Sequence, residues 1–320
     1  MTDQYDVVII GAGPAGLAAG LSLVRARRRT LMIDSNRPRN AATLRSHGFI
    51  TRDGVSPLEL RKIGRGEFEG YPAAQFHTAL ALSVTATNVD EISGDLSFHE
   101  SRFRVVTRGL RGEASRDVSA RTVLIATGLL ETLPALPSIR AWYGTNVHSC
   151  IDCDGYEKAD AALALIGESD DLAERALLIS QWTSDLIVFT NAVGTVTAAD
   201  EAALLRRGIR VDRRPIADVV GERGAMTGVL LADGEVIARE GGFVRPGWAP
   251  AIDYLDASVL GQLERDRDGL VVVDDQGRTS IAGLYAAGDS TPPGAEQLMV
   301  AAGLGARAAA AINRDLIGPL

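Results

Sequence analysis

The only two cysteines of this 320-residue chain, Cys150 and Cys153, stand three positions apart. A C-x-x-C pair can bind a metal, form a structural disulfide or exchange electrons. A disulfide across so short a loop restricts the unfolded chain very little, which argues against a purely structural bond. Zinc normally takes four ligands, and only His148 lies near the pair in the sequence, so we predict no metal site. Redox chemistry is left, and it needs an electron carrier.

Thiol–disulfide exchange also needs a base, because a cysteine with an ordinary pKa of about 8.5 is mostly protonated at neutral pH. Asp154, directly after the second cysteine, and His148 are the candidates. His148 suits the pH range better, although a histidine with no part in the reaction fits the sequence equally well. Tyr143 and Tyr156 bracket the pair and either line a substrate groove or belong to the core.

A glycine-rich turn near the N-terminus is the first candidate for the carrier's binding site. It follows an apolar run over residues 5–10, typical of a buried parallel strand, and precedes a helical pattern over residues 17–27. A second apolar strand over residues 30–34 ends in an acid. The turn consists of Gly11, Ala12, Gly13, Pro14, Ala15 and Gly16. This order of strand, turn, helix and strand-end acid predicts a dinucleotide site.

Each glycine has a physical role in such a site. Gly11 allows the tight turn, Gly13 lets the backbone approach a pyrophosphate, and Gly16 lets the helix pack closely on the strand. The amide groups at the start of the helix hold the phosphates. Asp34 can accept hydrogen bonds from the adenosine ribose.

Two later strand ends favour FAD as the dinucleotide. Residues 122–128 predict a strand that ends in Thr127 and Gly128, and residues 281–289 predict one that ends in Gly288 and Asp289. An acid at a strand end, close to a helix start, can bind the ribityl hydroxyls of a flavin. Each segment alone is an ordinary strand end. Together with the N-terminal turn they resemble the flavoprotein disulfide reductases with two dinucleotide domains, in which FAD occupies the first site.

Within that group, the chain resembles the low-molecular-weight thioredoxin reductases over nearly its whole length. The shared features are the N-terminal turn, the C-x-x-C-D-G motif at 150–155, the segment 279–289, and the late Glu296 and Gln297. This resemblance implies that Cys153 lies next to the flavin and that Cys150 exchanges with the substrate. It also implies that Asp154 is the acid–base group and that the protein is a homodimer.

Other segments resemble a side branch, the gliotoxin- and holomycin-type dithiol oxidases. These segments are Arg39-Asn40, His47 with the following residues 51–57, residues 155–157 and residues 181–191. The resemblance implies that Asn40 and His47 lie toward the flavin. The oxidases usually carry histidine directly after the second cysteine, whereas this chain has Asp154, as thioredoxin reductases do.

A second glycine-rich turn, which an NADPH site would need, is not intact. A strand over residues 163–167 and a helix over residues 172–182 are expected, but only Gly167 remains of the fingerprint between them. Three carboxylates crowd the helix start, where they suit the helix dipole and would repel a pyrophosphate; they are Glu168, Asp170 and Asp171. Residues 190–192 replace the His-Arg-Arg with which thioredoxin reductases grip NADPH. NADPH is therefore a doubtful cofactor.

We therefore expect an α/β fold with two three-layer, Rossmann-like dinucleotide-binding domains. The FAD domain should be discontinuous, formed by residues 1–116 and 247–320, with residues 117–246 as an insert that carries the cysteines. Gly241 and Gly242 could act as a hinge near the return crossing.

Composition and hydropathy limit the classes of binding partner and the location that we expect for the protein. The net charge of −8 and the pI of about 5.1 argue against binding nucleic acid. No run of eighteen apolar residues predicts a membrane span, and the first ten residues lack the basic region of a signal peptide. We expect a cytoplasmic protein.

Three classes of function remain. The first is an FAD-dependent dithiol oxidase, or another disulfide oxidoreductase that works without NADPH. The second is an NADPH-dependent thioredoxin reductase with a divergent nucleotide site. The third is a flavin-binding protein without turnover, which the intact C-x-x-C argues against. The substrate is either a small-molecule dithiol or a thioredoxin-like protein.

Overall fold

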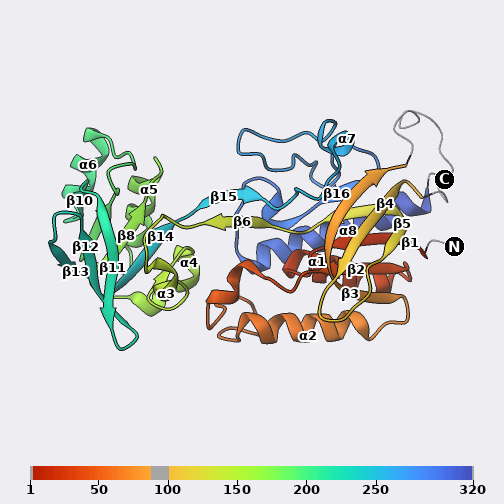
Figure 1. Ribbon diagram of the computed structural model, residues 1–320, viewed down its shortest axis with the longest axis horizontal. Coiled ribbons are helices and arrows are strands. Elements are labelled where there is room, and N and C mark those ends of the chain that lie inside the picture. The colour runs from red at the N-terminus through yellow and green to blue at the C-terminus, as the bar shows by residue number, and fades with distance from the viewer. Residues whose placement is uncertain (1–2, 88–100, 319–320) are drawn as a thin grey trace.

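A computed structural model describes residues 3–87 and 101–318. Two α/β units lie side by side and are joined by a narrow ribbon of two strands (Figure 1). The ribbon consists of β6 (Leu129–Thr132) and β15 (Gly247–Pro250), which pair antiparallel. The chain crosses to the second unit in β6 and returns in β15, so the first unit is built from both ends of the sequence.

The first unit contains a six-stranded sheet in the order β1-β2-β3-β4-β5-β16. At its centre, β1 pairs in parallel with both β2 and β5, and its apolar residues are buried on both faces. The strands are β1 (Asp3–Ile10), β2 (Thr30–Asp34), β3 (Ala74–Ala86), β4 (Phe103–Gly109), β5 (Asp117–Ile125) and β16 (Leu284–Ala286).

The pairing of β5 corrects one predicted boundary. We expected the insert to begin at residue 117, but Asp117–Ile125 pairs with β1 from Asp3↔Val118 to Ile10↔Ile125 and is central to the first sheet. A central strand needs apolar residues on both faces, and Val123 and Leu124 pack on opposite sides of the sheet. The crossing to the second unit therefore comes after β5.

Helices cover one face of the first sheet. α1 (Pro14–Arg25) packs against α2 (Pro57–Glu69) and α8 (Leu298–Ile317). The opposite face is covered by the segment around the short α7 (Ala257–Leu260), which contributes Ile252 and Leu255 to the core. The short helices η1 (Arg39–Ala42) and η3 (Gly288–Ser290) follow β2 and β16 at the edge where the predicted cofactor residues lie.

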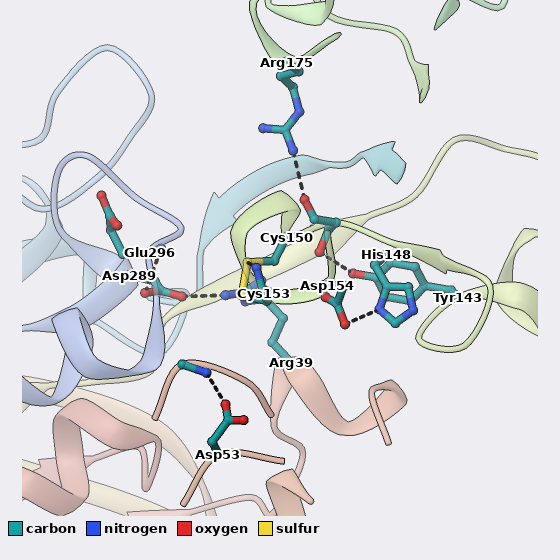
Figure 2. Close-up of a disulfide and its surroundings, with 12 residues drawn as sticks. Arg39, Asp53, Tyr143, His148, Cys150, Cys153, Asp154, Arg175, Asp289 and Glu296 are labelled. Atoms are coloured by element: carbon teal, nitrogen blue, oxygen red, sulfur yellow. Dashed lines mark hydrogen bonds and ion pairs between the residues drawn. A yellow bond between two sulfur atoms is a disulfide. The ribbon is translucent and has the colours of Figure 1, made fainter. Parts of the chain in front are cut away.

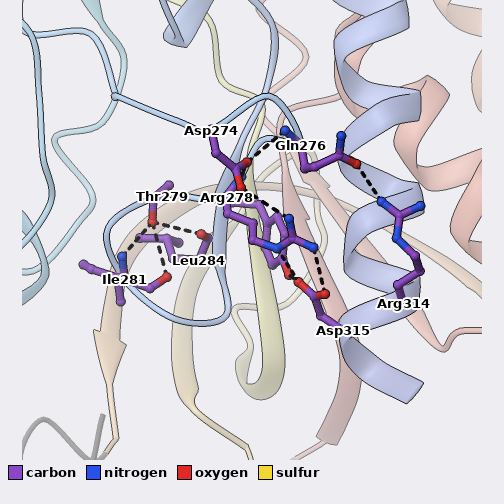
Figure 3. Close-up of polar contacts among 9 residues, drawn as sticks. Asp274, Gln276, Arg278, Thr279, Ile281, Leu284, Arg314 and Asp315 are labelled. Carbon is purple, nitrogen blue, oxygen red and sulfur yellow. Dashed lines mark hydrogen bonds and ion pairs between the residues drawn. The ribbon is translucent and has the colours of Figure 1, made fainter. Parts of the chain in front are cut away.

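A polar cluster fastens the end of α8 to the loop before β16 (Figure 3). Arg278 donates from Nε and Nη2 to the carboxylate of Asp315, at 2.7 and 2.9 Å. Arg314 donates to Gln276 at 2.6 Å. These contacts bring the C-terminal helix against the turn at residues 274–278.

The second unit has a parallel sheet in the order β10-β9-β8-β14-β7. Its strands are β7 (Val147–His148), β8 (Leu163–Gly167), β9 (Leu186–Phe189), β10 (Arg210–Asp212) and β14 (Gly241–Arg245). One face packs on α5 (Leu172–Ile179) and α6 (Ala198–Leu205). The other packs on α3 (Ile139–Trp142) and an antiparallel sheet of β11 (Ile216–Glu222), β12 (Ala225–Leu231) and β13 (Val236–Ala238). Both units therefore have the predicted three layers.

Gly241 and Gly242 do not lie at a crossing. Both belong to β14, between β7 and β8. A Cβ added to Gly242 would lie 2.1 Å from the carbonyl oxygen of Ala164, so close packing of strands accounts for this glycine.

Among the helices in residues 3–87 and 101–318, none combines the length and apolar character that a bilayer crossing requires.

Candidate active site

A cavity of about 810 Å³ lies at the carboxyl ends of the strands of the first sheet. Eleven of the predicted cofactor residues line it: Gly11, Gly13, Pro14, Ala15, Asp34, Asn40, Thr127, Gly128, Gly288, Asp289 and Glu296. They come from segments far apart in the sequence that meet because parallel strands present their ends at one edge. A cavity of this size suits a large cofactor.

The glycine-rich turn has the geometry that a dinucleotide needs. Gly11 has φ +106°, and a Cβ there would lie 2.2 Å from the carbonyl oxygen of Ala126. A Cβ on Gly16 would lie 1.9 Å from the carbonyl oxygen of Gly11, so this glycine lets α1 pack on the turn and does not line the cavity. A Cβ on Gly13 would meet no heavy atom within 4 Å. The backbone at Gly13 is therefore open to the cavity, where a pyrophosphate would lie at the start of α1.

The two strand-end acids of the cavity have arginine partners that the sequence did not predict. Asp34 accepts hydrogen bonds from the amide of Ala12 at 2.8 Å and from Arg61 at 2.7 Å. Asp289 pairs with Arg39 at 2.7 Å. Burial raises the pKa of the Asp289 carboxyl, and the charge of Arg39 opposes this effect. The residues present fit FAD, because they combine a phosphate cradle with fixed acceptors at both ends of the cavity.

Besides Gly16, two predicted cofactor residues lie away from the cavity wall. Gln297 is exposed and immediately precedes α8. His47 lies with Nδ1 3.5 Å from Asp53 and Nε2 3.4 Å from Glu157. Glu157 belongs to η2 (Tyr156–Lys158), just after the cysteine motif. His47 thus connects the first unit to the cysteine segment, and its role toward the flavin stays a prediction.

Cys150 and Cys153 form a disulfide. Cys150 is the residue before α4 (Ile151–Asp154), and its Sγ accepts a hydrogen bond from the amide of Cys153 at 3.2 Å. Both cysteines are half-buried, and neither lines the cavity. The disulfide segment does face the first unit, since a Cβ on Gly144 would lie 2.2 Å from the carbonyl oxygen of Ala42 in η1. Figure 2 draws the disulfide together with the ion pair of Arg39 and Asp289.

The structure brings the two predicted acid–base residues together. His148 and Asp154 are both buried, and Nδ1 of the histidine lies 2.9 Å from the carboxylate (Figure 2). The contact has the distance of an ion pair without the direction of a good hydrogen bond. Nε2 lies 2.9 Å from the carbonyl oxygen of Thr145. A carbonyl only accepts, so Nε2 carries a proton and Nδ1 is the atom that faces Asp154.

The turn between β8 and α5 is filled by the protein's own side chains. Leu172 is buried between Gly167 and Gly194, whose added Cβ atoms would lie 2.5 and 2.7 Å from it. The amide of Thr195 donates to the carbonyl of Ser169 at 3.1 Å. The loop after β9 therefore packs directly on the turn.

Two of the three carboxylates at this turn, Glu168 and Asp171, have internal partners. Asp171 accepts from Ser169 at 2.6 Å and from Nε of Arg245 at 2.7 Å. Burial alone would raise the pKa of Asp171, but these two hydrogen bonds lower it. Asn191 donates to Glu168 at 2.7 Å. The guanidinium of Arg245 is thus already paired with the carboxylate of Asp171.

Comparisons with known proteins agree with this arrangement of cavity and disulfide. The family model of the pyridine nucleotide-disulphide oxidoreductases matches residues 5–305. The chain belongs to this family. Its relatives are flavin-dependent disulfide oxidoreductases of the thioredoxin reductase type, which use FAD. This family membership accounts for the two dinucleotide-binding domains of the fold.

Individual relatives cover nearly the whole chain. The thioredoxin reductase of Aquifex aeolicus is 28% identical, and the match covers 98% of this chain and 94% of that protein. The crystal structure of a thioredoxin reductase-like protein from Bacillus anthracis, TrxB, is 35% identical with a TM-score of 0.86, covering 98% of each chain. The crystal structure of HlmI is also 35% identical with a TM-score of 0.86, covering 98% of this chain and 93% of HlmI.

Proposed function

We propose that this disulfide oxidoreductase transfers electrons from a substrate dithiol to FAD through Cys150 and Cys153 without using NADPH. The observation that carries the proposal is the filled turn between β8 and α5. A pyrophosphate at this helix start would have to displace the Leu172 packing and compete with Asp171 for Arg245. Three features together support a thiol as the electron donor: the disulfide of the second unit, the cavity lined by the predicted FAD residues, and the turn between β8 and α5 that the chain's own side chains fill.

The chemistry follows from the residues of the disulfide segment. A thiolate of the substrate attacks Cys150, the disulfide opens, and Cys153 leaves as a thiolate. The second substrate thiol then closes the substrate disulfide and leaves both cysteines reduced. Asp154 with His148 supplies the acid–base group for this exchange. FAD, when bound, accepts the electron pair from the cysteines, and oxygen is the terminal acceptor that we propose.

The assignment to the dithiol oxidases is supported by the similarity to HlmI, a holomycin-related protein, at 35% identity over nearly the full length. The oxidases' histidine after the second cysteine is absent, but His148 places an imidazole against Asp154 from the other side of the motif. We propose that this pair takes over the role of that histidine.

An anaerobic titration tests the proposal. The purified holoprotein is mixed with excess NADPH in one sample and with excess dithiothreitol in another, and the flavin absorbance is followed. We expect bleaching with the dithiol only, and return of the colour when air is admitted. Fast bleaching by NADPH would contradict the proposal. Cys153→Ser serves as the matched variant, because it keeps the cavity but should not bleach with the dithiol.

An NADPH-dependent thioredoxin reductase is the second candidate. Asp154 favours it, as do the relatives named thioredoxin reductase. This function would show as bleaching by NADPH and NADPH-dependent reduction of a thioredoxin. A flavin protein without turnover would bleach with neither donor.

Further properties of the protein are proposals of the same kind. We propose a cytoplasmic homodimer that acts on a small-molecule dithiol or a thioredoxin-like protein. Light scattering on a sizing column measures the oligomeric state, and turnover with each class of thiol separates the substrates.

A further inference from the structure

A chain of hydroxyl groups connects the disulfide segment with the wall of the cofactor cavity. Oγ of Ser149, the residue before Cys150, lies 2.8 Å from the hydroxyl of Tyr143. The hydroxyl of Tyr143 donates a hydrogen bond to Oε1 of Glu131. Glu131 lies on the connecting strand β6 and lines the cavity.

The number of protons fixes the direction of these hydrogen bonds. Tyr143 has a single hydroxyl proton and gives it to the carboxylate of Glu131, so Ser149 donates to Tyr143. The oxygen of Ser149, the residue that directly precedes Cys150 in the sequence, is then the accepting end of the chain. When Glu131 is protonated, both bonds can reverse. The chain therefore has two orientations that differ by the passage of one proton.

The surroundings hold this chain in place and adjust its acceptor. Arg175 donates to the backbone carbonyl of Ser149 at 2.9 Å and so fixes the residue from α5. Burial raises the pKa of the Glu131 carboxyl, while the hydrogen bond from Tyr143 and the charges of Arg39 and Arg140 oppose this effect. Glu131 is thus a better proton acceptor near neutral pH than an exposed glutamate.

The reaction needs such an acceptor. A dithiol that becomes a disulfide gives up two electrons and two protons, and a flavin takes the electron pair with one proton. One proton must leave the site each time the cysteines are reoxidised. At that step the S–H bond of Cys150 breaks, its sulfur bonds again to Cys153, and the electron pair passes to the flavin. Asp154 belongs to the exchange with substrate, so this proton needs a separate route.

We propose that Ser149, Tyr143 and Glu131 form a proton relay that takes the proton from the thiol of Cys150 to the rim of the cofactor cavity. The proposal rests on the proposed electron transfer from the cysteines to FAD. Ser149 accepts from Cys150 as it donates to Tyr143, Tyr143 donates to Glu131, and Glu131 releases the proton to water.

Tyr143→Phe tests the relay because it removes only the middle hydroxyl. In anaerobic stopped-flow experiments with dithiothreitol, we expect flavin bleaching to slow by about tenfold to a hundredfold at about pH 6.5. The difference should shrink to less than about threefold at about pH 9.5, where cysteine thiols ionise without help. Glu131→Gln should behave in the same way. Ser149→Thr keeps a hydroxyl and should keep the rate, whereas Ser149→Ala should not.

Tyr71→Phe is the matched control, since it also removes one tyrosine hydroxyl hydrogen bond, that from Arg25, at a position outside the relay. Equal slowing of Tyr143→Phe at both pH values would assign only a structural role to the tyrosine and overturn the relay. Bleaching of Tyr143→Phe at the wild-type rate at about pH 6.5 would do the same.

A time-resolved infrared difference spectrum, recorded while dithiothreitol reduces the protein, gives a readout independent of flavin absorbance. Because Glu131 passes its proton on to water, we expect the C=O band of a protonated carboxylic acid to appear transiently in the wild type, to shift in D₂O, and to be missing in Glu131→Gln. A band that persists unchanged in this variant would overturn the relay. If the dithiol fails to bleach the wild type, the proposed function fails; if it bleaches wild type and Tyr143→Phe alike, only the relay fails.

Discussion

At the scale of single residues, types and spacing predicted eleven of the residues that line the cavity but none of the arginine partners of its two strand-end acids. Gly11, Gly13 and Asp34 belong to one continuous strand–turn–helix–strand motif, so the sequence alone predicted that they lie at one site. Arg61 reaches Asp34 from α2, and Arg39 reaches Asp289 across 250 positions. Such partners depend on how elements pack, which no local pattern specifies.

Asp154 offers a test at this scale. We expect Asp154→Asn to slow reduction of the flavin by dithiol at about pH 7 by roughly 10²–10⁴, because the amide cannot exchange a proton with the sulfurs. The buried pair with His148 would also lose its charge. Stopped-flow absorbance measures the rate. Asp152→Asn, an exposed acid in the same motif, is the control and should stay within about twofold of wild type; an equal loss in both variants would contradict the assignment.

At the scale of elements, the sequence predicted β2 and β8 with their observed bounds and placed α1 and α5 correctly. Each has an uninterrupted apolar pattern bounded by glycine or charge. The assignment of β5 to the insert was wrong, because a buried strand looks the same whichever sheet it joins. The sequence did not predict the hydrogen bond between Tyr143 and Glu131 either. This contact depends on how the connecting strand β6 is placed against the second unit, which no local pattern specifies.

Two glycines of the first turn should respond differently to the same substitution. Gly11→Ala places a Cβ 2.2 Å from a carbonyl oxygen at positive φ, so we expect the free energy of unfolding of the apoprotein to fall by about 1–3 kcal/mol. A Cβ at Gly13 would meet no heavy atom within 4 Å, so the apoprotein of Gly13→Ala should keep its stability. Its affinity for FAD should fall at least about tenfold, because the Cβ would take the space of the pyrophosphate. Urea unfolding and flavin titration separate the effects. Unchanged flavin affinity in Gly13→Ala would place the pyrophosphate elsewhere.

At the scale of the whole molecule, the bidentate pair of Arg278 and Asp315 joins the end of α8 to the turn at residues 274–278, just before β16. Burial alone would raise the pKa of Asp315, but the hydrogen bond and charge of Arg278 lower it. A carboxyl with a lowered pKa in the folded state stabilises the protein above its unfolded pKa. This contribution is lost as the pH falls through the folded pKa.

We therefore expect Arg278→Ala to lower the free energy of unfolding by about 0.5–1 kcal/mol at pH 7, as for a well-aligned pair at the surface. The difference from wild type should shrink at a pH well below the ordinary pKa of an aspartate, once Asp315 is protonated in both proteins. Urea unfolding at the two pH values measures it. Arg267→Ala, whose side chain is 93% exposed, is the control and should change little. A difference that persists at low pH would show that packing, not charge, joins the helix.

The contact between α8 and the first turn has a consequence for synthesis of the protein. A Cβ on Gly305 would lie 2.0 Å from the carbonyl oxygen of Ala15, so α8 packs directly on the segment that we predict to hold the pyrophosphate. A nascent chain on the ribosome has made that segment first, yet lacks its support until residue 305 has left the exit tunnel. We therefore expect stable loading of the vitamin-derived cofactor to wait until the segment around residue 305 has been made and can fold onto the first turn.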